Sequence, residues 1–446
     1  MIWFLACTAF SLFLTGRAVL NLFRDRFPHP TDLATLSICY YGVPLAVAGY
    51  FDLNYLHMVF LANFAADPGL AVLSIQYVTL ALLALQCGRM IGQQPGPPKM
   101  NRFGAINTLA FERVRFVFIG LIALIALGVY LFGLNEFLAG YNTEGLDITG
   151  ATGSAVVYAT LEYMGLAIAY AMVIGLRTNR IPFKTLIAIC LAIMLAILAI
   201  RAKRLEIVTA FIAPAIILLS KRSAISSTSW RLIVVSVSVF VLVVISALRA
   251  SVELNIWDGA FLAFAEGLYA GHSLPGISER LQTHTLAYEY GARFINALLG
   301  FVPRFLWEGK DEMVYAGNLA LKGVAPLGAT TLLAEVVLQG GLIAVAICYT
   351  AMGFIFERIM RFQDVWDECI NADIIPARFG AYLIAVAIFV PHFRDGIIPA
   401  VKIALQAGVF FAILSSMRLT GKARIVVQAV PGEDHHEKPS VAAASH

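Results

Sequence analysis

Three groups of basic residues stand where a very hydrophobic chain has little reason to keep them. The first group is Arg201, Lys203 and Arg204, between two apolar runs with almost no loop separating them. A basic side chain deep in a membrane helix costs about 2.5–3.5 kcal/mol on insertion scales, so three retained charges indicate an anion site. The alternative is that these long side chains reach back to water at the helix ends.

The second group lies in a long polar-interrupted stretch, and the third lies in a broken apolar run near the C-terminus. The second comprises Arg249, Arg280, Arg293, Arg304 and Lys310, and the third is Arg394 with Lys402. Pro391 and Gly396 interrupt the run around Arg394, and ionisable groups at a broken membrane helix are candidates for function. A simple surface turn formed by Arg394 and Asp395 is the alternative.

Guanidinium groups bind phosphate oxygens through paired hydrogen bonds and stay charged at any working pH. Several arginines on the outer face of the membrane would suit a membrane-bound diphosphate. They could stabilise this diphosphate as the leaving group of a glycosyl transfer without a metal ion. The predicted diphosphate ligands are Arg201, Lys203, Arg204, Arg249, Arg304, Lys310 and Arg394.

Two residues are the predicted acid or base of such a site. Glu335 begins an apolar run and precedes Gly340 and Gly341, which allow close helix approach. A carboxylate at that depth can exchange protons near neutral pH, although a purely structural, hydrogen-bonded role is the alternative. His392 is the other candidate base. Further candidates that no spacing selects are Glu253, Asp258, Glu266, His272, Glu279, His284 and Glu289.

No metal site, cofactor or nucleic-acid partner is predicted. The six cysteines are scattered without paired spacing, so they are expected to be small hydrophobic residues. His435 and His436 lie in a polar tail and form no ligand pattern. The net charge of +4 is modest and fits a membrane protein with basic inner loops.

The elements that must position these residues are membrane helices. Of the 446 residues, 60% are hydrophobic and 13% charged, whereas a soluble chain has about 25% charged residues. Apolar runs of about 20 residues, enough to cross a hydrocarbon core of ~30 Å, predict an all-α polytopic membrane protein with about eleven transmembrane helices. The expected spans are 2–22, 32–51, 69–88, 114–134, 154–175, 183–200, 205–220, 232–248, 331–356, 379–392 and 397–417.

Alternate loops are rich in Lys and Arg and should face the cytoplasm, which puts the N-terminus outside and the C-terminus in the cytoplasm. Four regions follow: an N-terminal bundle of about eight helices over 1–248, a large outer helical loop over 249–330, about three further helices over 331–420, and a disordered cytoplasmic tail over 421–446.

The outer loop is expected to contain amphipathic helices partly embedded in the membrane. Leu286, Tyr290, Phe294 and Leu298 recur at helical spacing, and residues 269–276 contain the Gly, Pro and His expected to break the helices apart. The loop is predicted to form a lid over a lipid-linked substrate, and a passive loop anchored by an aromatic belt is the alternative.

The run Pro303-Arg304-x-x-Trp307-x-x-Lys310 resembles the signature of the Wzy-type oligosaccharide repeat-unit polymerases. In that family Pro commonly follows the Lys, whereas Asp311 follows it here. The stretch 328–335 with Gly340, and the Arg-containing turn 201–204, are also similar to the family. The overall plan of helices and one large outer loop resembles it over most of the chain.

The resemblance implies a C-type glycosyltransferase membrane fold in the bacterial inner membrane. Such enzymes transfer a growing glycan from undecaprenyl diphosphate to the next lipid-linked repeat unit on the periplasmic face, in O-antigen or exopolysaccharide synthesis. The implied partners are the undecaprenyl-diphosphate-linked oligosaccharide, the lipid bilayer and a chain-length regulator. Alternative functions are an O-antigen ligase, a flippase or transporter of an anionic lipid-linked substrate, and a non-catalytic assembly partner.

Overall fold

The three-dimensional arrangement comes from a computed structural model. The structure describes residues 1–52, 68–93, 106–107, 119–127, 130, 160, 162–169, 172, 209, 212–216, 236, 267–300, 302, 306–307, 309–314, 321, 324, 330–367 and 374–416. These residues are almost entirely helical. The described residues form one extended pairing, an antiparallel ladder between β1 (Ile106–Asn107) and β2 (Ile374–Ile375).

Four helices are long and apolar enough to cross a membrane, which agrees with a multi-pass membrane protein. They are α1 (Ile2–Arg24), α2 (Pro30–Tyr50), α4 (Pro68–Gly92) and α16 (Leu332–Met360). They confirm the predicted spans 2–22, 32–51, 69–88 and 331–356. The predicted span 183–200 lies outside the described residues, and only parts of the spans 114–134, 154–175, 205–220 and 232–248 are described. The expected total of eleven helices therefore stays a prediction.

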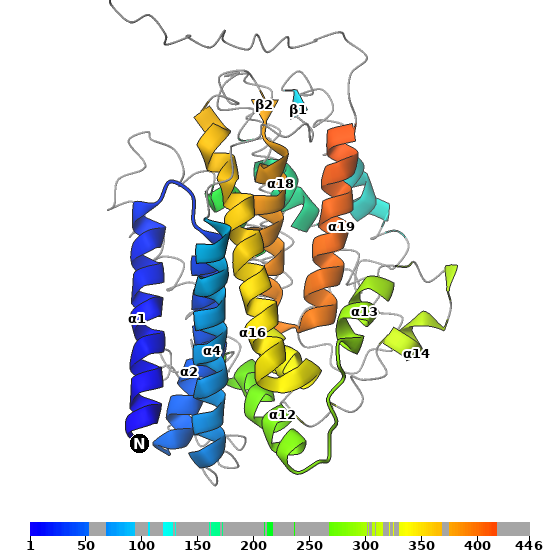
Figure 1. The fold of residues 1–446 in the computed structure, drawn as a ribbon. Helices are drawn as coiled ribbons and strands as arrows, with labels where there is room; N and C mark the ends of the chain where they lie inside the picture. Colours follow the sequence, from blue (N-terminus) through cyan, green and yellow to red (C-terminus); the bar gives the residue numbers. More distant parts are fainter. Residues whose placement is uncertain are drawn as a thin grey trace, which may run out of the picture.

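The first three helices form a tight group (Figure 1). α1 buries Phe4, Cys7, Ser11, Leu14 and Ala18, whose spacing of three and four residues places them on one face. This face packs on α2 and α4, while large hydrophobic side chains on the opposite face stay exposed. A helix that is apolar on all sides suits a lipid environment.

Glycines allow α4 and α16 to approach closely. A Cβ at Gly88 would collide with the backbone oxygen of Thr350, and one at Gly353 would collide with that of Leu85. Gly88 and Gly92 are four residues apart on α4, a spacing of small residues that favours helix contact in membranes. The two helices lie side by side in the same direction (Figure 1).

α16 is a broken helix with two different halves. Residues 332–339 are buried on every side, whereas Leu342, Ile343 and Ile347 beyond the break are exposed as a lipid-facing surface would be. At the break Gly341 has φ +59° and ψ −138°, a conformation that residues with a Cβ avoid. The two glycines therefore interrupt the helix, rather than only allowing close helix approach as the sequence suggested.

A helical hairpin follows α16. It consists of α18 (Ala377–Ile384), a π-helical turn (Ala385–Phe389), a 3₁₀ turn η7 (Pro391–Arg394) and α19 (Ile397–Ser416). Near the start of α18, Phe27, Phe362, Trp366, Phe379 and Tyr382 pack their rings together, with centroids between 4.8 and 6.2 Å apart. Edge and stacked aromatic contacts of this kind stabilise a core beyond the area that they bury.

The described part of the outer loop is helical. Residues 267–271 are helical, His272 lies in a turn, and α12 (Ser273–Gln282) begins directly after it, so a break between helices falls within the stretch 269–276, as predicted. Pro275 lies in the first turn of α12, where proline is tolerated. Two shorter helices follow, α13 (Ala292–Leu299) and α14 (Lys310–Val314).

The predicted amphipathic face over 286–298 is only partly helical, because Leu286 and Tyr290 precede α13 while Phe294 and Leu298 lie within it. Tyr290 and Leu298 are exposed, while Arg293 and Ala297 are the buried residues of α13. The helix begins only after Gly291, whose φ of +93° forms a left-handed turn. Arg293 is the buried charged residue of this helix, and it has acidic partners in Glu335 and Glu289.

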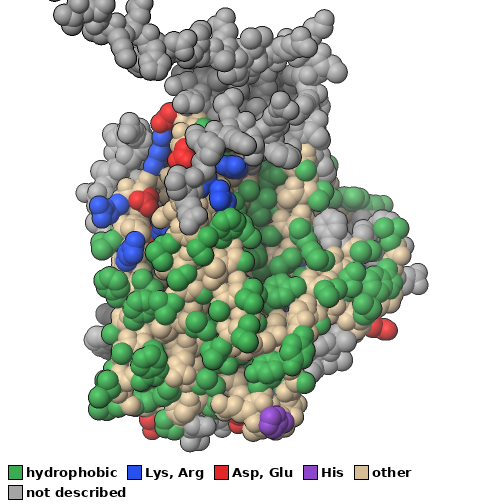
Figure 2. All heavy atoms as spheres, in the orientation of Figure 1, with side chains coloured by type: hydrophobic (Ala, Val, Ile, Leu, Met, Phe, Trp, Pro, Cys, Tyr) green, Lys and Arg blue, Asp and Glu red, His purple; other side chains and the backbone are tan. Residues whose placement is uncertain are grey.

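Lys and Arg side chains gather near the upper end of the surface in Figure 2, above a broad hydrophobic band. Arg24, Arg89 and Arg358 occupy the last turns of α1, α4 and α16, which end near one another there. Cations at helix C-termini also interact favourably with the helix dipoles. The bundle of described helices therefore has one basic end, and α12 and α16 begin at the opposite end (Figure 1).

Candidate functional site

The structure brings the two predicted acid–base candidates to one region, at the end of α16 away from the basic surface. Glu335 lies in the first turn of α16 and His392 lies in η7, just before α19. Lys310 and Arg394 are also described. The remaining predicted diphosphate ligands, Arg201, Lys203, Arg204, Arg249 and Arg304, lie outside the described residues.

The start of α16 is fixed by side chains that cap it. The hydroxyl of Thr331 accepts a hydrogen bond from the backbone N–H of Ala334 at 3.3 Å, as an N-cap residue does. Ser273 of α12 in turn accepts from the backbone N–H of Thr331 at 3.0 Å. These bonds place Glu335 at a defined depth, with only 2% of the residue exposed.

Glu335 accepts three hydrogen bonds. Its Oε1 accepts from the hydroxyl of Thr330 at 2.6 Å and from Nη1 of Arg293 at 3.1 Å. Its Oε2 accepts from the backbone N–H of Ile397 at 2.7 Å, so the carboxylate caps the N-terminus of α19 from another helix. A carboxylate occupied in this way acts as a structural acceptor, the alternative that the sequence left open for this residue.

Gly396 makes room for that carboxylate. Any Cβ at this position would collide with the carboxyl atoms of Glu335, and the backbone has φ +84°, which favours glycine. The interruption at Pro391–Gly396 therefore allows Glu335 of α16 to contact the start of α19.

Arg293 connects the outer loop to α16 through two carboxylates. In addition to Glu335, its guanidinium contacts Glu289, with Nε 2.8 Å from Oε2 and Nη2 donating to Oε1 at 3.3 Å. Arg293 is 2% exposed, while the side chain of Glu289 is 22% exposed. Because Glu335 and Glu289 match the charge of Arg293, this arginine is not a free anion ligand.

Gln339 links the same loop to the break in α16. Its Oε1 accepts from the backbone N–H of Gly291 at 2.9 Å, and its Nε2 donates to Oε2 of Glu289 at 3.0 Å. The backbone N–H of Glu289 donates to the carbonyl of Leu338 at 3.0 Å. The loop thus docks on α16 where the helix breaks. We call Glu289, Arg293, Thr330, Glu335 and Gln339 the N-terminal network.

His392 lies between two carboxylates. Its Nε2 is 3.0 Å from Oε1 of Glu162, and its Nδ1 is 2.8 Å from Oδ2 of Asp395. An imidazolium can donate from both nitrogens, so the geometry suits a protonated ring. Glu162 and His392 are buried, whereas the side chain of Asp395 is 28% exposed. We call these three residues the His392 triad.

Lys310 binds backbone carbonyls. Its Nζ donates to the carbonyl of Gly300 at 3.2 Å and to that of Val302 at 2.7 Å, just beyond the end of α13. A lysine at the last carbonyls of a helix is a common way to end it. The residue is 4% exposed, so in this structure it connects α14 to α13.

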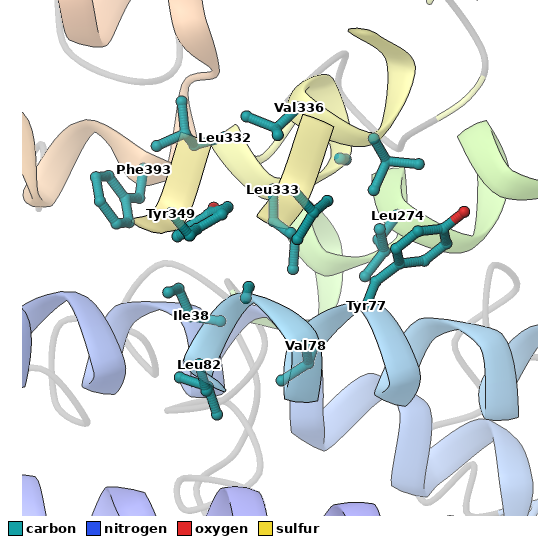
Figure 3. Close-up of a cluster of buried hydrophobic side chains, with 14 of the residues drawn as sticks. Ile38, Tyr77, Val78, Leu82, Leu274, Leu332, Leu333, Val336, Tyr349 and Phe393 are labelled. Carbon is teal, nitrogen blue, oxygen red and sulfur yellow. The ribbon is translucent and has the colours of Figure 1, made fainter. Parts of the chain in front are cut away.

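A small cavity lies beside the start of α16, between α2, α12 and η7. Its lining includes Thr331, Tyr349 and Phe393, and Figure 3 shows the rings of Tyr349 and Phe393 next to each other. Its volume of about 10 Å³ has room for one water molecule. This cavity is therefore too small for a sugar or a diphosphate.

Sequence reasoning missed Glu162 and the pairing of Arg293. Glu162 is the single charged residue in the predicted span 154–175, and an intramembrane acid is a functional candidate by default. That signal was available. The pairing of Arg293 with Glu335 had no local signal because the partners are 42 positions apart.

A second buried ionic cluster, the C-terminal cluster, lies at the basic end of α16 and contains His29, Asp32, Arg89 and Glu357. His29 is 3.0 Å from Oε2 of Glu357, and its Nδ1 accepts from the backbone N–H of Thr31 at the start of α2. Arg89 lies 3.4 Å from Asp32 and 3.5 Å from Glu357. These contacts tie the ends of α2, α4 and α16 together.

The N-terminal network and the His392 triad each bury ionisable groups inside an apolar bundle, where such groups are candidates for function. In the described part of the chain, no group of three or more His, Cys, Asp or Glu side chains is placed to hold a metal ion. Comparisons of the chain with protein-family models, with curated proteins and with solved structures found no match.

Proposed function

We propose that this protein polymerises undecaprenyl-diphosphate-linked oligosaccharide repeat units on the periplasmic face of a bacterial inner membrane. The growing glycan is transferred to a hydroxyl of the next lipid-linked unit. The observation that carries the proposal is the position of Lys310, the last residue of the run that resembles the polymerase signature. Lys310 begins α14, which packs on α13, and α13 supplies Arg293 to Glu335.

The distribution of charge favours an enzyme with a site at one face over a transporter. Between Gln339 and Glu357, α16 contains no charged residue. A flippase or transporter of an anionic substrate needs polar groups along a path from both sides. The broken helix α16 is a feature that transporters also have. Transport of the lipid-linked donor by vesicles containing the protein, without polymer formation, would favour that alternative.

An O-antigen ligase would use the same donor and a different acceptor. The two activities separate in a deletion strain. Loss of a polymerase leaves a single repeat unit on the lipopolysaccharide core, and loss of a ligase leaves none. Gel separation of the lipopolysaccharide distinguishes these outcomes.

The direct test is extension of a defined undecaprenyl-diphosphate oligosaccharide by the purified protein, followed as a ladder of products. Arg304→Ala and Arg394→Ala should abolish long products, because guanidinium groups are expected to hold the diphosphate. Arg358→Ala is the matched control, since this exposed arginine lies at the opposite end of α16. Normal ladders from both site variants would refute the predicted diphosphate site.

A further inference from the structure

The His392 triad contains one group that a substrate can reach. Glu162 and His392 are 0% and 1% exposed, whereas the side chain of Asp395 is 28% exposed. A group that takes a proton from a substrate must come within hydrogen-bond distance of it. Among these three residues, Asp395 alone meets that condition in the structure.

The two predicted bases are engaged inside the protein. Both oxygens of Glu335 accept hydrogen bonds, from Thr330, Arg293 and Ile397. Both ring nitrogens of His392 face carboxylate oxygens at 3.0 and 2.8 Å. Using either as the base would require breaking buried hydrogen bonds before a hydroxyl could approach, and leaving such groups unsatisfied is unfavourable.

We propose that Asp395 is the catalytic base that takes the proton of the acceptor hydroxyl, and that His392 and Glu162 are positioning residues that hold it; this assignment rests on the proposed polymerase function. The O–H bond of the acceptor breaks and its proton goes to the Asp395 carboxylate. The hydroxyl oxygen forms a bond to the anomeric carbon of the donor. The bond from this carbon to the diphosphate oxygen breaks, and its electron pair leaves with the undecaprenyl diphosphate.

The order of the triad suits this division of roles. The imidazole ring bonds Asp395 on one side and the buried Glu162 on the other, so the orientation of Asp395 is set from inside the bundle. Among the described residues, Oε2 of Glu162 has no hydrogen-bond partner.

The surroundings of Asp395 support a negative charge at the exposed end. Asp395 directly precedes Gly396 and the N-terminus of α19, a helix of 20 residues whose dipole favours anions there. Arg394, a predicted diphosphate ligand, is the preceding residue. The proposed base and the proposed leaving-group ligand therefore come from the same turn.

The experiment measures polymerisation rates of the purified full-length protein on the defined lipid-linked oligosaccharide. Asp395→Asn should lower kcat by about 10²–10⁴-fold, the usual contribution of a general base, and Asp395→Glu should recover part of it. His392→Gln and Glu162→Gln should lower kcat and shift the pH profile, with little change in KM. Asp52→Asn is the matched control because this exposed carboxylate lies just after the end of α2, outside the His392 triad.

Two measurements distinguish a catalytic role of Asp395 from a structural role, and the assignment of Asp395 from the proposed polymerase function. Formate added to Asp395→Ala should restore part of the rate, which a purely structural role of Asp395 would not allow. Full activity of Asp395→Asn, or a folded Asp395→Ala protein without formate rescue, would overturn the assignment and leave the polymerase function standing. A wild-type protein that forms no polymer would overturn the polymerase function, and the assignment with it.

Discussion

The two ends of α16 carry buried ionic groups in different settings, separated along the helix by on the order of 30 Å. At the C-terminal cluster, charges sit where helix ends favour them, with Asp32 in the first turn of α2 and Arg89 in the last turn of α4. At the N-terminal network the helix is broken, and Glu335 caps a different helix. The first arrangement connects helix ends, while the second holds irregular backbone in place.

Exposure separates the two ends as well. The N-terminal network and the His392 triad each include a carboxylate that is partly open, Glu289 at 22% and Asp395 at 28%. In the C-terminal cluster Glu357 and Arg89 are 16% and 17% exposed, and Asp32 is 4% exposed. Next to this cluster the aromatic rings of Phe27, Phe362 and Tyr382 pack closely. The more open carboxylates therefore lie at the N-terminal end, where the proposed function expects the substrate.

Arg293→Ala should have the largest effect on stability. The substitution leaves Glu335 and Glu289 without their buried cation, and breaking a buried pair in this way costs about 3–5 kcal/mol. Thermal unfolding in detergent, followed by intrinsic fluorescence, measures the change. Arg293→Lys should lose less because it keeps the charge. An unchanged melting temperature in Arg293→Ala would show that the network does not hold the loop on α16.

Gly396→Ala should have the next largest effect. The new Cβ would displace the Glu335 carboxylate and strain a backbone with φ +84°, at a cost of about 1–3 kcal/mol. Gly16→Ala is the matched control in α1, where a Cβ would meet no atom within 4 Å. We expect that control to be neutral or slightly stabilising. Equal melting temperatures of the two variants would contradict the proposed packing of Gly396 on Glu335.

Arg89→Ala tests the C-terminal cluster, and its effect on stability should be smaller than that of Arg293→Ala in the N-terminal network. The ion-pair distances of Arg89, 3.4 and 3.5 Å, are longer than those of Arg293, and Arg89 is more exposed. We expect a loss of about 1–2 kcal/mol in the free energy of unfolding. Polymer formation by the folded fraction should stay at the wild-type rate. A specific loss of activity in folded Arg89→Ala protein would mean that the C-terminal cluster takes part in function.

Arg26→Ala should have the smallest effect. Arg26 and Asp367 form an ion pair at 2.9 Å, but their side chains are 39% and 73% exposed. Exposed pairs contribute less than about 1 kcal/mol because water and salt screen them. The melting temperature should fall slightly or not at all, and added salt should remove any difference. A large loss would show that the basic end is more tightly coupled than its exposure indicates.

The sequence by itself determined the apolar helical class and the positions of α1, α2, α4 and α16, and it named Glu335 and His392, which the structure brings to one region. These features are local, because about 20 consecutive apolar residues suffice to mark a span and Pro or Gly marks an interruption. Glu335 and His392 were found because each ionisable group stands at such an interruption. Glu162 was missed because it stands at no such interruption, although it is the single charged residue of its predicted span.

The tertiary structure decided which charges meet. Arg293 reaches Glu335 across 42 positions, and Glu162 reaches His392 across 230. Partners this far apart have no periodic relation in the sequence, so only packing of the helices brings them together. Packing also turned α13 so that its arginine is buried, and made Glu335 a cap for α19. Packing of the helices also buries Glu162 and His392 and leaves Asp395 as the partly exposed carboxylate of the triad.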